Sequence, residues 1–490
     1  MYSVAKNPEN IAIVGSGFLG MTLALRLAKT GVNVTLFESG SEIGGLASAW
    51  EIGDVTWDKH YHVTLASDSN TRKLVEELGL GDDFNWVETK TGFYTDGELV
   101  SMSNTMEFLK FPPLGLLSKL RLGGTIFFAS RVKDWKRLEK ISVEKWLTRL
   151  SGKKTFEKMW KPLLLAKLGE AYKDTSAAFI WATIQRMYAA RNSGLKKELF
   201  GYVRGGYARV LERFSEVLLE NGVEIRLNAR VDSIEKLGNS KIRVATAATR
   251  RHSDTKPRIV PQKTKYAKFQ TAATVAPGFS GAFLSEPQPK PNRVIQFPQG
   301  YEADIFDKVI LTCPSNVAAK MTPQLTKIEK QDLENICYQG IVCASVLMKR
   351  SLSKFYVTNI TDEAPFTGVI EMSALVDKRE FGGNALVYLP KYVAPDDELF
   401  DKTDDEIREI FFSGLKKMYP QFSRKDVVEF KVSRVRQVFP LPVLNYSRDL
   451  PDTKTSVDGL YVVNSSHIVN GTLNVNETVA LAENFYRDNF

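Results

Sequence analysis

The sequence predicts an α/β fold in which a parallel sheet carries a glycine-rich loop. An apolar run at 11–14 leads into Gly15, Gly17 and Gly20, which form a Gly-x-Gly-x-x-Gly pattern ahead of an amphipathic stretch. A second apolar run, at 33–37, ends at an acidic residue. A strand, a glycine turn, a helix and an acidic-ended strand at this spacing are typical of a Rossmann-type dinucleotide-binding unit.

Each glycine of the pattern has a separate role in such a unit. Gly15 permits the tight turn, Gly17 lets a pyrophosphate approach the backbone, and Gly20 allows the helix to pack closely on the strand. The helix N-terminus then offers free N–H groups to the phosphates, and Gly31 is expected to end the helix. Glu38 is placed to accept hydrogen bonds from a ribose diol, and its charge would repel the 2′-phosphate of NADP.

A second glycine pair distinguishes between the dinucleotides. Gly44 and Gly45 follow Glu38 by six and seven residues, at an offset for which a plain NAD-binding unit has no need of paired glycines. The pair resembles the second fingerprint of the flavin amine oxidase superfamily. That superfamily includes monoamine oxidases, protoporphyrinogen oxidases, phytoene desaturases and, more distantly, UDP-galactopyranose mutases. The resemblance implies FAD, with the glycine backbone against the ribityl and phosphate portion.

The resemblance extends along most of the chain, and it is closest to proteins described as protoporphyrinogen-oxidase-like. The segments that carry it are 57–62, 160–169, 201–211, 222–231, 306–314, 365–371, 458–464 and 474–480. One departure concerns the last strand, which ends in Asn464-Ser-Ser-His467 in place of the usual glycine-rich stretch. Because all three cysteines lie upstream of the segment used for covalent attachment in monoamine oxidases, we expect noncovalent FAD.

The resemblance and the motifs together nominate the site residues. The expected cofactor-binding residues are Gly15, Gly17, Phe18, Leu19, Gly20, Glu38, Ser39, Gly44, Gly45, Leu46, Ala47, Val231, Thr312, Asn464 and Val475. His62 and His60 are the catalytic candidates, because an imidazole transfers protons near neutral pH. The alternative is that each histidine only hydrogen-bonds the backbone or the flavin. For Arg204, an anion-binding role and a structural role both remain open.

The chain length predicts two interleaved domains. The Rossmann-type FAD-binding domain is expected from 1–85, 203–315 and 435–490, with an inserted loop at 247–292. An α+β substrate domain is expected from a mostly helical part, 90–200, and a sheet part, 320–430. Within the sheet part we predict strands at 340–348, 367–371 and 384–389, and a helix at 403–418 that Thr403 and Glu406 cap.

Composition narrows the function classes. Of 490 residues, 43% are hydrophobic and 25% charged, which are globular values. The net charge of +9 comes without a nucleic-acid motif, and four histidines and three cysteines form no metal-binding pattern, so we expect neither nucleic acid nor a bound metal. With no secretory signal and no uninterrupted apolar run of about 18 residues, we expect a cytoplasmic protein. We predict that the apolar segment 109–128 forms a pocket wall or a packed helix, and the alternative is peripheral membrane contact.

Three function classes remain at this point. The first is an FAD-dependent oxidoreductase that takes a hydride from a hydrophobic or cyclic small molecule and forms a C=C or C=N bond. The second is a redox-neutral flavoenzyme, such as a UDP-sugar mutase or an isomerase. The third is an FAD-binding protein without catalysis. The sequence leaves the substrate, the electron acceptor and the oligomeric state open.

Overall fold

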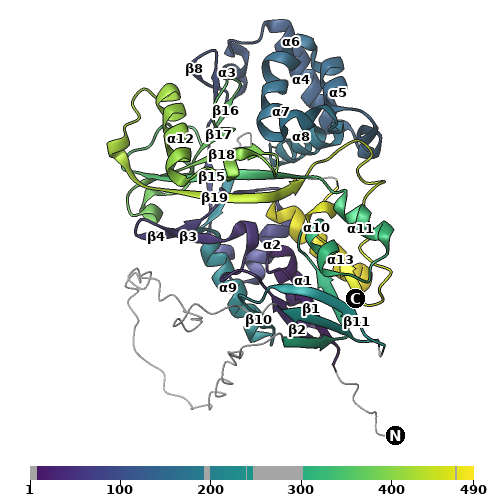
Figure 1. Cartoon of the computed structure of the whole chain (residues 1–490). Helices are drawn as coiled ribbons and strands as arrows, with labels where there is room; N and C mark the ends of the chain where they lie inside the picture. The colour runs from purple at the N-terminus through teal and green to yellow at the C-terminus, as the bar shows by residue number, and fades with distance from the viewer. Residues whose placement is uncertain (1–7, 192–198, 239, 247–301, 470–471) are drawn as a thin grey trace, which may run out of the picture.

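The computed structural model describes residues 8–191, 199–238, 240–246, 302–469 and 472–490. Two sheets organise these residues, one below the other in Figure 1. The lower sheet has five parallel strands in the order β10-β2-β1-β14-β20, and the upper sheet has seven strands in the order β19-β15-β18-β17-β16-β7-β8. The predicted α/β fold with a parallel sheet is therefore confirmed.

The parallel sheet is buried on both faces, which explains why its strands are continuously apolar. Ile11 and Ile13 of β1 face one hydrophobic cluster, whereas Ala12 and Val14 face another. The strands are β1 (Asn10–Val14), β2 (Asn33–Phe37), β10 (Glu224–Arg226), β14 (Lys308–Leu311) and β20 (Leu460–Val462).

Helices cover one face of this sheet, and a small sheet with two helices covers the other. The first cover is α1 (Phe18–Ala28), α2 (Ser69–Glu77), α9 (Gly206–Glu220) and α13 (Val475–Asn489). The second is β11 (Val231–Lys236), β12 (Ile242–Thr246) and β13 (Glu302–Phe306), with α10 (Ser315–Met321) and α11 (Lys327–Glu334). Gly31, at φ 84°, follows the end of α1 as predicted.

The seven-stranded sheet separates a helix-covered side from the side that faces the parallel-sheet unit. In its buried strand β15, Val342, Ala344 and Val346 pack toward α12 (Asp404–Met418), while Ile341 and Cys343 face a cluster that includes Trp57. The strands are β7 (Thr91–Thr95), β8 (Glu98–Ser101), β15 (Tyr338–Met348), β16 (Val357–Ile360), β17 (Gly368–Glu371), β18 (Ala385–Val393) and β19 (Val427–Pro440).

A group of helices packs on one end of this sheet. They are α3 (Thr105–Lys110), α4 (Leu116–Arg131), α5 (Val143–Ser151), α6 (Lys153–Thr155), α7 (Lys161–Leu168) and α8 (Ala177–Arg191). All of them except the short α6 contribute to one core, and the predicted apolar face of α5 is buried in it through Val143, Trp146 and Leu147. No helix in the described part of the chain is long and apolar enough to cross a bilayer.

Two further small sheets link the larger units. They are β3 (Ala49–Ile52) with β4 (Val55–Asp58), and β9 (Leu199–Val203) between β5 (Thr64–Leu65) and β6 (Phe84–Glu88). The strands predicted at 340–348, 367–371 and 384–389 are present as β15, β17 and β18. The predicted capping box is also present, because Thr403 and Glu406 bond each other's backbone N–H at the start of α12.

We propose that the chain forms the two interleaved domains expected from the sequence. The parallel-sheet unit draws its strands from near both ends and the middle of the chain, as the division requires. One boundary differs, because β19 stays in the seven-stranded sheet until Pro440, past the expected start at 435. The loop expected at 247–292 lies outside the described residues.

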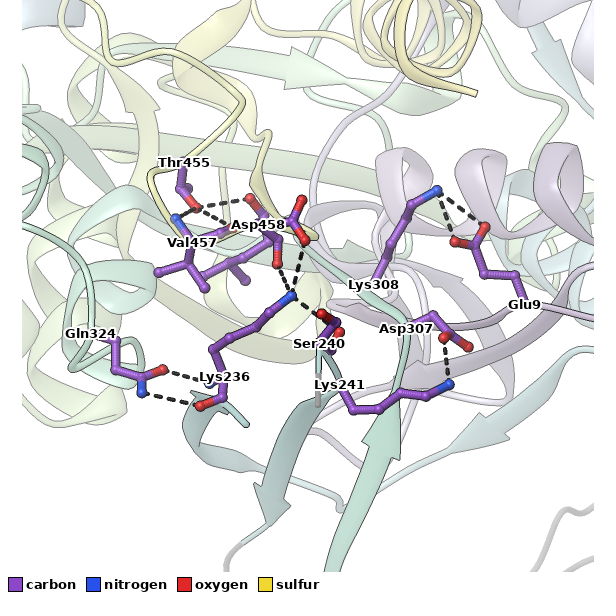
Figure 2. A network of polar contacts seen from close by, with 11 residues as sticks. Glu9, Lys236, Ser240, Lys241, Asp307, Lys308, Gln324, Thr455, Val457 and Asp458 are labelled. Carbon is purple, nitrogen blue, oxygen red and sulfur yellow. Dashed lines mark hydrogen bonds and ion pairs between the residues drawn. The ribbon is translucent and has the colours of Figure 1, made fainter. Parts of the chain in front are cut away.

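Ion pairs and hydrogen bonds of charged side chains connect the amino ends of the parallel strands to neighbouring segments (Figure 2). Lys308, the first residue of β14, pairs with Glu9 just before β1, and Lys241 pairs with Asp307. Lys236 at the end of β11 donates to the Asp458 carboxylate and backbone just before β20. This network ties the small sheet to the parallel sheet at the end opposite the glycine loop.

Candidate active site

The glycine loop at the carboxyl end of β1 is held tightly from beneath. Thr312, which follows β14, donates its hydroxyl to the carbonyls of Val14 (2.9 Å) and Gly15 (3.1 Å). A Cβ on Gly15 would lie 2.5 Å from that hydroxyl, and Gly15 has φ 110°. A Cβ on Gly20 would lie 2.0 Å from the carbonyl oxygen of Gly15. These two glycines are therefore required by the packing of the protein itself.

Gly17 is different, because nothing in its surroundings requires a glycine. An added Cβ would meet no atom within 4 Å, and φ −69° suits any residue. Gly17 is the N-cap of α1, where no side chain caps the helix and no acidic residue occupies the first turn. The uncapped start of α1 therefore lies beside the open space at Gly17, at the positive end of the helix dipole.

The second glycine pair lies directly against this loop. The N–H of Gly44 donates to the carbonyl of Ser16 at 2.9 Å, and a Cβ on Gly45 would lie 3.4 Å from the Cα of Gly17. Both have positive φ, 106° and 56°. The backbone then turns through Leu46 and Ala47. The two fingerprints, which are separated by 24 residues between Gly20 and Gly44, thus form one backbone-lined cradle.

The carboxylate of Glu38 lies at the edge of the cradle. It accepts hydrogen bonds from the N–H and hydroxyl of Ser16 (3.0 and 2.6 Å) and from the N–H of Gly40 (2.8 Å), with the Ser39 hydroxyl at 3.2 Å. Its backbone carbonyl accepts from the N–H of Ala229 at 2.8 Å. The turn that leads to Val231 therefore runs beside Glu38.

The remaining cofactor candidates are placed around the cradle in supporting positions. Val231 is buried at the start of β11, and Val475 is the partly buried first residue of α13. Asn464 is buried and already bonded to protein, since its amide donates to the Cys313 carbonyl at 2.8 Å and accepts from the Ser466 N–H at 2.9 Å. It braces the loop after β20.

The segment that follows β4 enters the space between the two large sheets. Its anchor is Asp58, which accepts from the N–H of Tyr207 at 2.8 Å and so caps α9. The hydroxyl of Tyr388 in β18 donates to the Asp58 carbonyl. Gly206 allows this approach, because a Cβ there would lie 2.9 Å from the Asp58 carboxylate. The anchor fixes His60, Tyr61 and His62 between the units.

The two candidate histidines differ in how far their ring nitrogens are engaged. In His60, Nδ1 bonds the Leu46 carbonyl and Nε2 bonds the Ser433 hydroxyl, each at 3.1 Å. Burial, followed by the nearby His62, lowers the pKa of His60 to about 4, so this ring is neutral at physiological pH. A neutral ring with both nitrogens bonded to protein serves as a brace between the cradle and β19.

His62 retains an unused nitrogen. Its Nδ1 is buried and makes no hydrogen bond to any described residue, while the Asp58 carboxylate lies 3.6 Å away. The ring packs on Tyr207, with centroids 5.0 Å apart. Of the two histidines, His62 is therefore the one with a ring nitrogen that no described residue hydrogen-bonds.

Two residues that sequence reasoning did not select also lie here. The ammonium of Lys167 in α7 lies 3.8 Å from the ring centroid of Tyr392 in β18, and the Tyr392 hydroxyl bonds that of Tyr61 at 3.0 Å. The available signal was a single cation in the apolar run Leu163-Leu-Leu-Ala-Lys167-Leu168. Its contact with Tyr392, over 200 positions away, has no signal in the local sequence.

Arg204 and two polar residues of the segment 367–371 have structural partners. Arg204 forms an ion pair with Asp83, which supports the structural alternative. The Thr367 hydroxyl donates to the Ala166 carbonyl at 2.8 Å. Glu371 is buried and accepts from the Leu352 N–H at 2.9 Å, and burial raises its pKa to about 7.

Comparisons with known proteins agree with this geometry. A family model described as flavin containing amine oxidoreductase matches residues 20–255 and 295–474. The zeta-carotene desaturase of Synechocystis sp. is 26% identical over 205 residues, which cover 37% of this chain and 42% of that protein. The chain spans about half or less of the length of the first relatives that it matches.

Solved structures share the fold over nearly the whole chain. A putative protoporphyrinogen oxidase from Exiguobacterium sp. 255-15 has a TM-score of 0.69 at 16% identity, with 98% of each chain covered. A variant of putrescine oxidase has a TM-score of 0.67 at 15% identity, again with 98% of each chain covered. At these identities the likeness is one of fold.

Proposed function

Because this chain belongs to the flavin-containing amine oxidoreductase family, we propose that it is an FAD-dependent oxidoreductase acting on an apolar or cyclic small molecule. The reaction would remove a hydride and a proton from neighbouring atoms and so form a C=C or C=N bond. Family membership confirms the flavin cofactor expected from the sequence. The activity and the substrate class are our proposal.

The observation that carries this proposal is the contrast among the glycines of the cradle. Gly15 and Gly20 are explained by protein packing, whereas the open space at Gly17 is explained by a ligand that approaches the backbone. The uncapped start of α1 would supply N–H groups to a pyrophosphate, and Glu38, which also accepts from Ser16, would accept from a ribose diol. The backbone of Gly44 and Gly45 would continue the surface that holds the cofactor.

When bound, FAD would supply the hydride acceptor. The residues of the chain would orient the substrate between the segment 57–62 and the seven-stranded sheet, and exclude water. We assign the proton transfer to His62. Its free Nδ1 and the nearby Asp58 carboxylate, 3.6 Å away, suit an imidazole that becomes charged during the reaction. His60 holds the segment in place.

The test is anaerobic mixing of the FAD-loaded protein with porphyrinogens, polyenes, amines and nucleotide sugars, following loss of the oxidised flavin absorbance. Bleaching by a porphyrinogen or polyene supports the proposal. Turnover of a nucleotide sugar only with pre-reduced flavin would instead indicate a redox-neutral mutase. If no compound reduces the flavin, the result would indicate an FAD-binding protein without catalysis and would contradict the proposal.

The role of His62 is tested by stopped-flow reduction with the substrate found in that screen. His62→Ala should slow flavin reduction by about 10²-fold while the FAD spectrum stays unchanged. His60→Ala is the matched control, and it should weaken FAD retention with less effect on the reduction step. An unchanged reduction rate in His62→Ala would remove His62 from the proton transfer.

We also propose that α3 and α4 contact a lipid surface. Most of the large apolar side chains exposed on the described structure belong to these helices, namely Met106, Leu109, Leu116, Leu117, Leu120, Phe127 and Phe128. The sequence from Phe108 to Lys133 contains five lysines and arginines and no acidic residue. Within α3 and α4, Glu107 is the acidic residue, and an apolar surface with this excess of cations suits a membrane with acidic headgroups.

Sedimentation with phosphatidylglycerol and phosphatidylcholine vesicles tests this contact. Binding should favour the acidic vesicles and fall at least several-fold in the double variant Leu117→Ser/Phe128→Ser. Ile328→Ser is the control, because Ile328 is 72% exposed, close to the 73% of Leu117, but lies on α11. If the double variant binds acidic vesicles as well as the wild type does, α3 and α4 do not form the lipid contact.

A further inference from the structure

Lys167 is a cation enclosed by aromatic rings. Its ammonium lies 3.8 Å from the ring centroid of Tyr392 and 5.1 Å from that of Phe439, and these two rings contact each other edge to face. The neighbouring residues of α7 are apolar, and Leu164 and Leu168 are buried in the helical core. Lys167 therefore extends its charge into the interior.

Three separate parts of the chain meet at this ammonium. Tyr61 belongs to the segment after β4, Lys167 belongs to α7, and Tyr392 belongs to β18. The Thr367 hydroxyl joins α7 to β18, because it donates to the Ala166 carbonyl and accepts from the Tyr392 N–H at 3.3 Å. The cluster thus lies at the junction where we place the substrate.

No carboxylate within the described chain pairs with Lys167, and the groups that face it are neutral. Burial raises the pKa of Tyr392 to about 12 and places that of Tyr61 well above its ordinary value. Burial also raises the pKa of the nearby Cys343 thiol. The same burial lowers the pKa of Lys167, as expected for an ammonium without a counter-charge.

The cluster also retains binding capacity. Lys167, Tyr61 and Tyr392 lie inside the protein, yet each side chain keeps partial accessibility, which indicates interior space beside them. In the bond between the two tyrosine hydroxyls, only one hydrogen is used. The second hydroxyl hydrogen and the three ammonium hydrogens remain available as donors.

We propose that Lys167, with Tyr61 and Tyr392, binds a carboxylate carried by the substrate. A buried ammonium without a counter-charge is unfavourable, and cation–π contact offsets only part of that cost. A carboxylate would supply the missing charge and accept both kinds of donor. This inference rests on the proposed function and narrows its substrate class to apolar molecules with a carboxylate. A cationic amine would be repelled by the ammonium.

Ligand titrations of the FAD-loaded protein test the proposal without turnover. The probes are 1-naphthoate, its amide 1-naphthamide and the cation 1-naphthylmethylammonium, followed by the flavin spectrum and by calorimetry. Naphthoate should bind at least tenfold more tightly than the amide, and the cation should bind least. Equal affinities, stronger binding of the cation, or no binding of any probe would overturn the proposal.

Variants at Lys167 identify the group responsible. Lys167→Met keeps the length of the side chain and should abolish the preference for naphthoate, whereas Lys167→Arg should retain it. If Lys167→Met does not fold, Tyr392→Phe becomes the deciding variant, and an unchanged preference there overturns the role of the cluster. FAD content of the wild type separates the two ideas, since absence of FAD contradicts the proposed function, while FAD without carboxylate preference contradicts only this inference.

Discussion

The two ends of the parallel sheet are built from different kinds of residue. At the amino end, ion pairs such as Lys308–Glu9 and Lys241–Asp307 join neighbouring elements. At the carboxyl end, glycines, backbone N–H groups and a helix N-terminus form the surface, with Glu38 as the charged side chain at its edge. The same strands therefore carry interactions that stabilise the fold at one end and a surface shaped for a ligand at the other.

This difference separates stability from binding in a way that variants can measure. Side chains at the amino end are satisfied by other side chains, so their loss should weaken folding. At the carboxyl end, a side chain added at Gly17 would start in open space, so substitution there should weaken binding rather than folding. Three predictions follow the contrast from its strongest expected effect to its weakest.

The largest effect is expected at Gly17. Gly17→Val should fold, because the new side chain meets no atom within 4 Å of its Cβ, yet it should purify without FAD because it fills the path of the pyrophosphate. FAD content and the free energy of unfolding of the apoprotein measure the two effects separately. Gly20→Val is the contrasting variant, since its Cβ would lie 2.0 Å from a backbone oxygen and should destabilise folding itself. Retention of FAD by Gly17→Val would contradict the assignment of the cradle.

An intermediate effect is expected at Lys236, which connects β11 to the residues before β20. Lys236→Met should lower the free energy of unfolding by roughly 1 kcal/mol, because hydrogen bonds to the Ser240 and Asp458 carbonyls are lost. Urea unfolding of the apoprotein measures this change. FAD affinity should stay within twofold of the wild type, and a larger loss would show that the two ends are coupled.

The smallest effect is expected at Asp307 and depends on pH. The Asn10 N–H and the Lys241 ammonium lower the pKa of Asp307 from its ordinary value of 3.8. A carboxylate with a lowered pKa stabilises the fold fully above its unfolded-state pKa, and this contribution is lost as the pH falls below about 4. In Asp307→Asn, the free energy of unfolding should therefore decline less between pH 5 and pH 3. An identical decline in both proteins would mean that Asp307 contributes nothing here.

Local patterns in the sequence predicted the cradle more completely than the rest of the site. The run from 11 to 38 indicates its strand, turn and helix through local spacing alone, and Gly20 packs against the nearby Gly15 carbonyl, although the contact that requires Gly15 comes from the distant Thr312. The capping box at Thr403 and Glu406 is local in the same sense.

The less predictable features depend on contacts between distant parts of the chain. His60 forms one of its two hydrogen bonds with the distant Ser433, and Arg204 forms an ion pair with the distant Asp83. The enclosure of Lys167 requires Tyr392 and Phe439, from two strands of the other sheet. No periodicity encodes these pairs, since they arise only when the tertiary structure brings the elements together.

The register of the parallel sheet has a consequence for synthesis of the protein. Ile11 of β1 pairs with Lys308, and Val309 of β14 pairs with Leu460. At 5–20 residues per second, a ribosome would take roughly 15–60 s to make the roughly 300 residues that separate β1 from β14. During that time β1 and α1 expose surfaces that are buried in the finished sheet. The cradle, which needs Thr312 beneath Gly15, is therefore completed only late in translation.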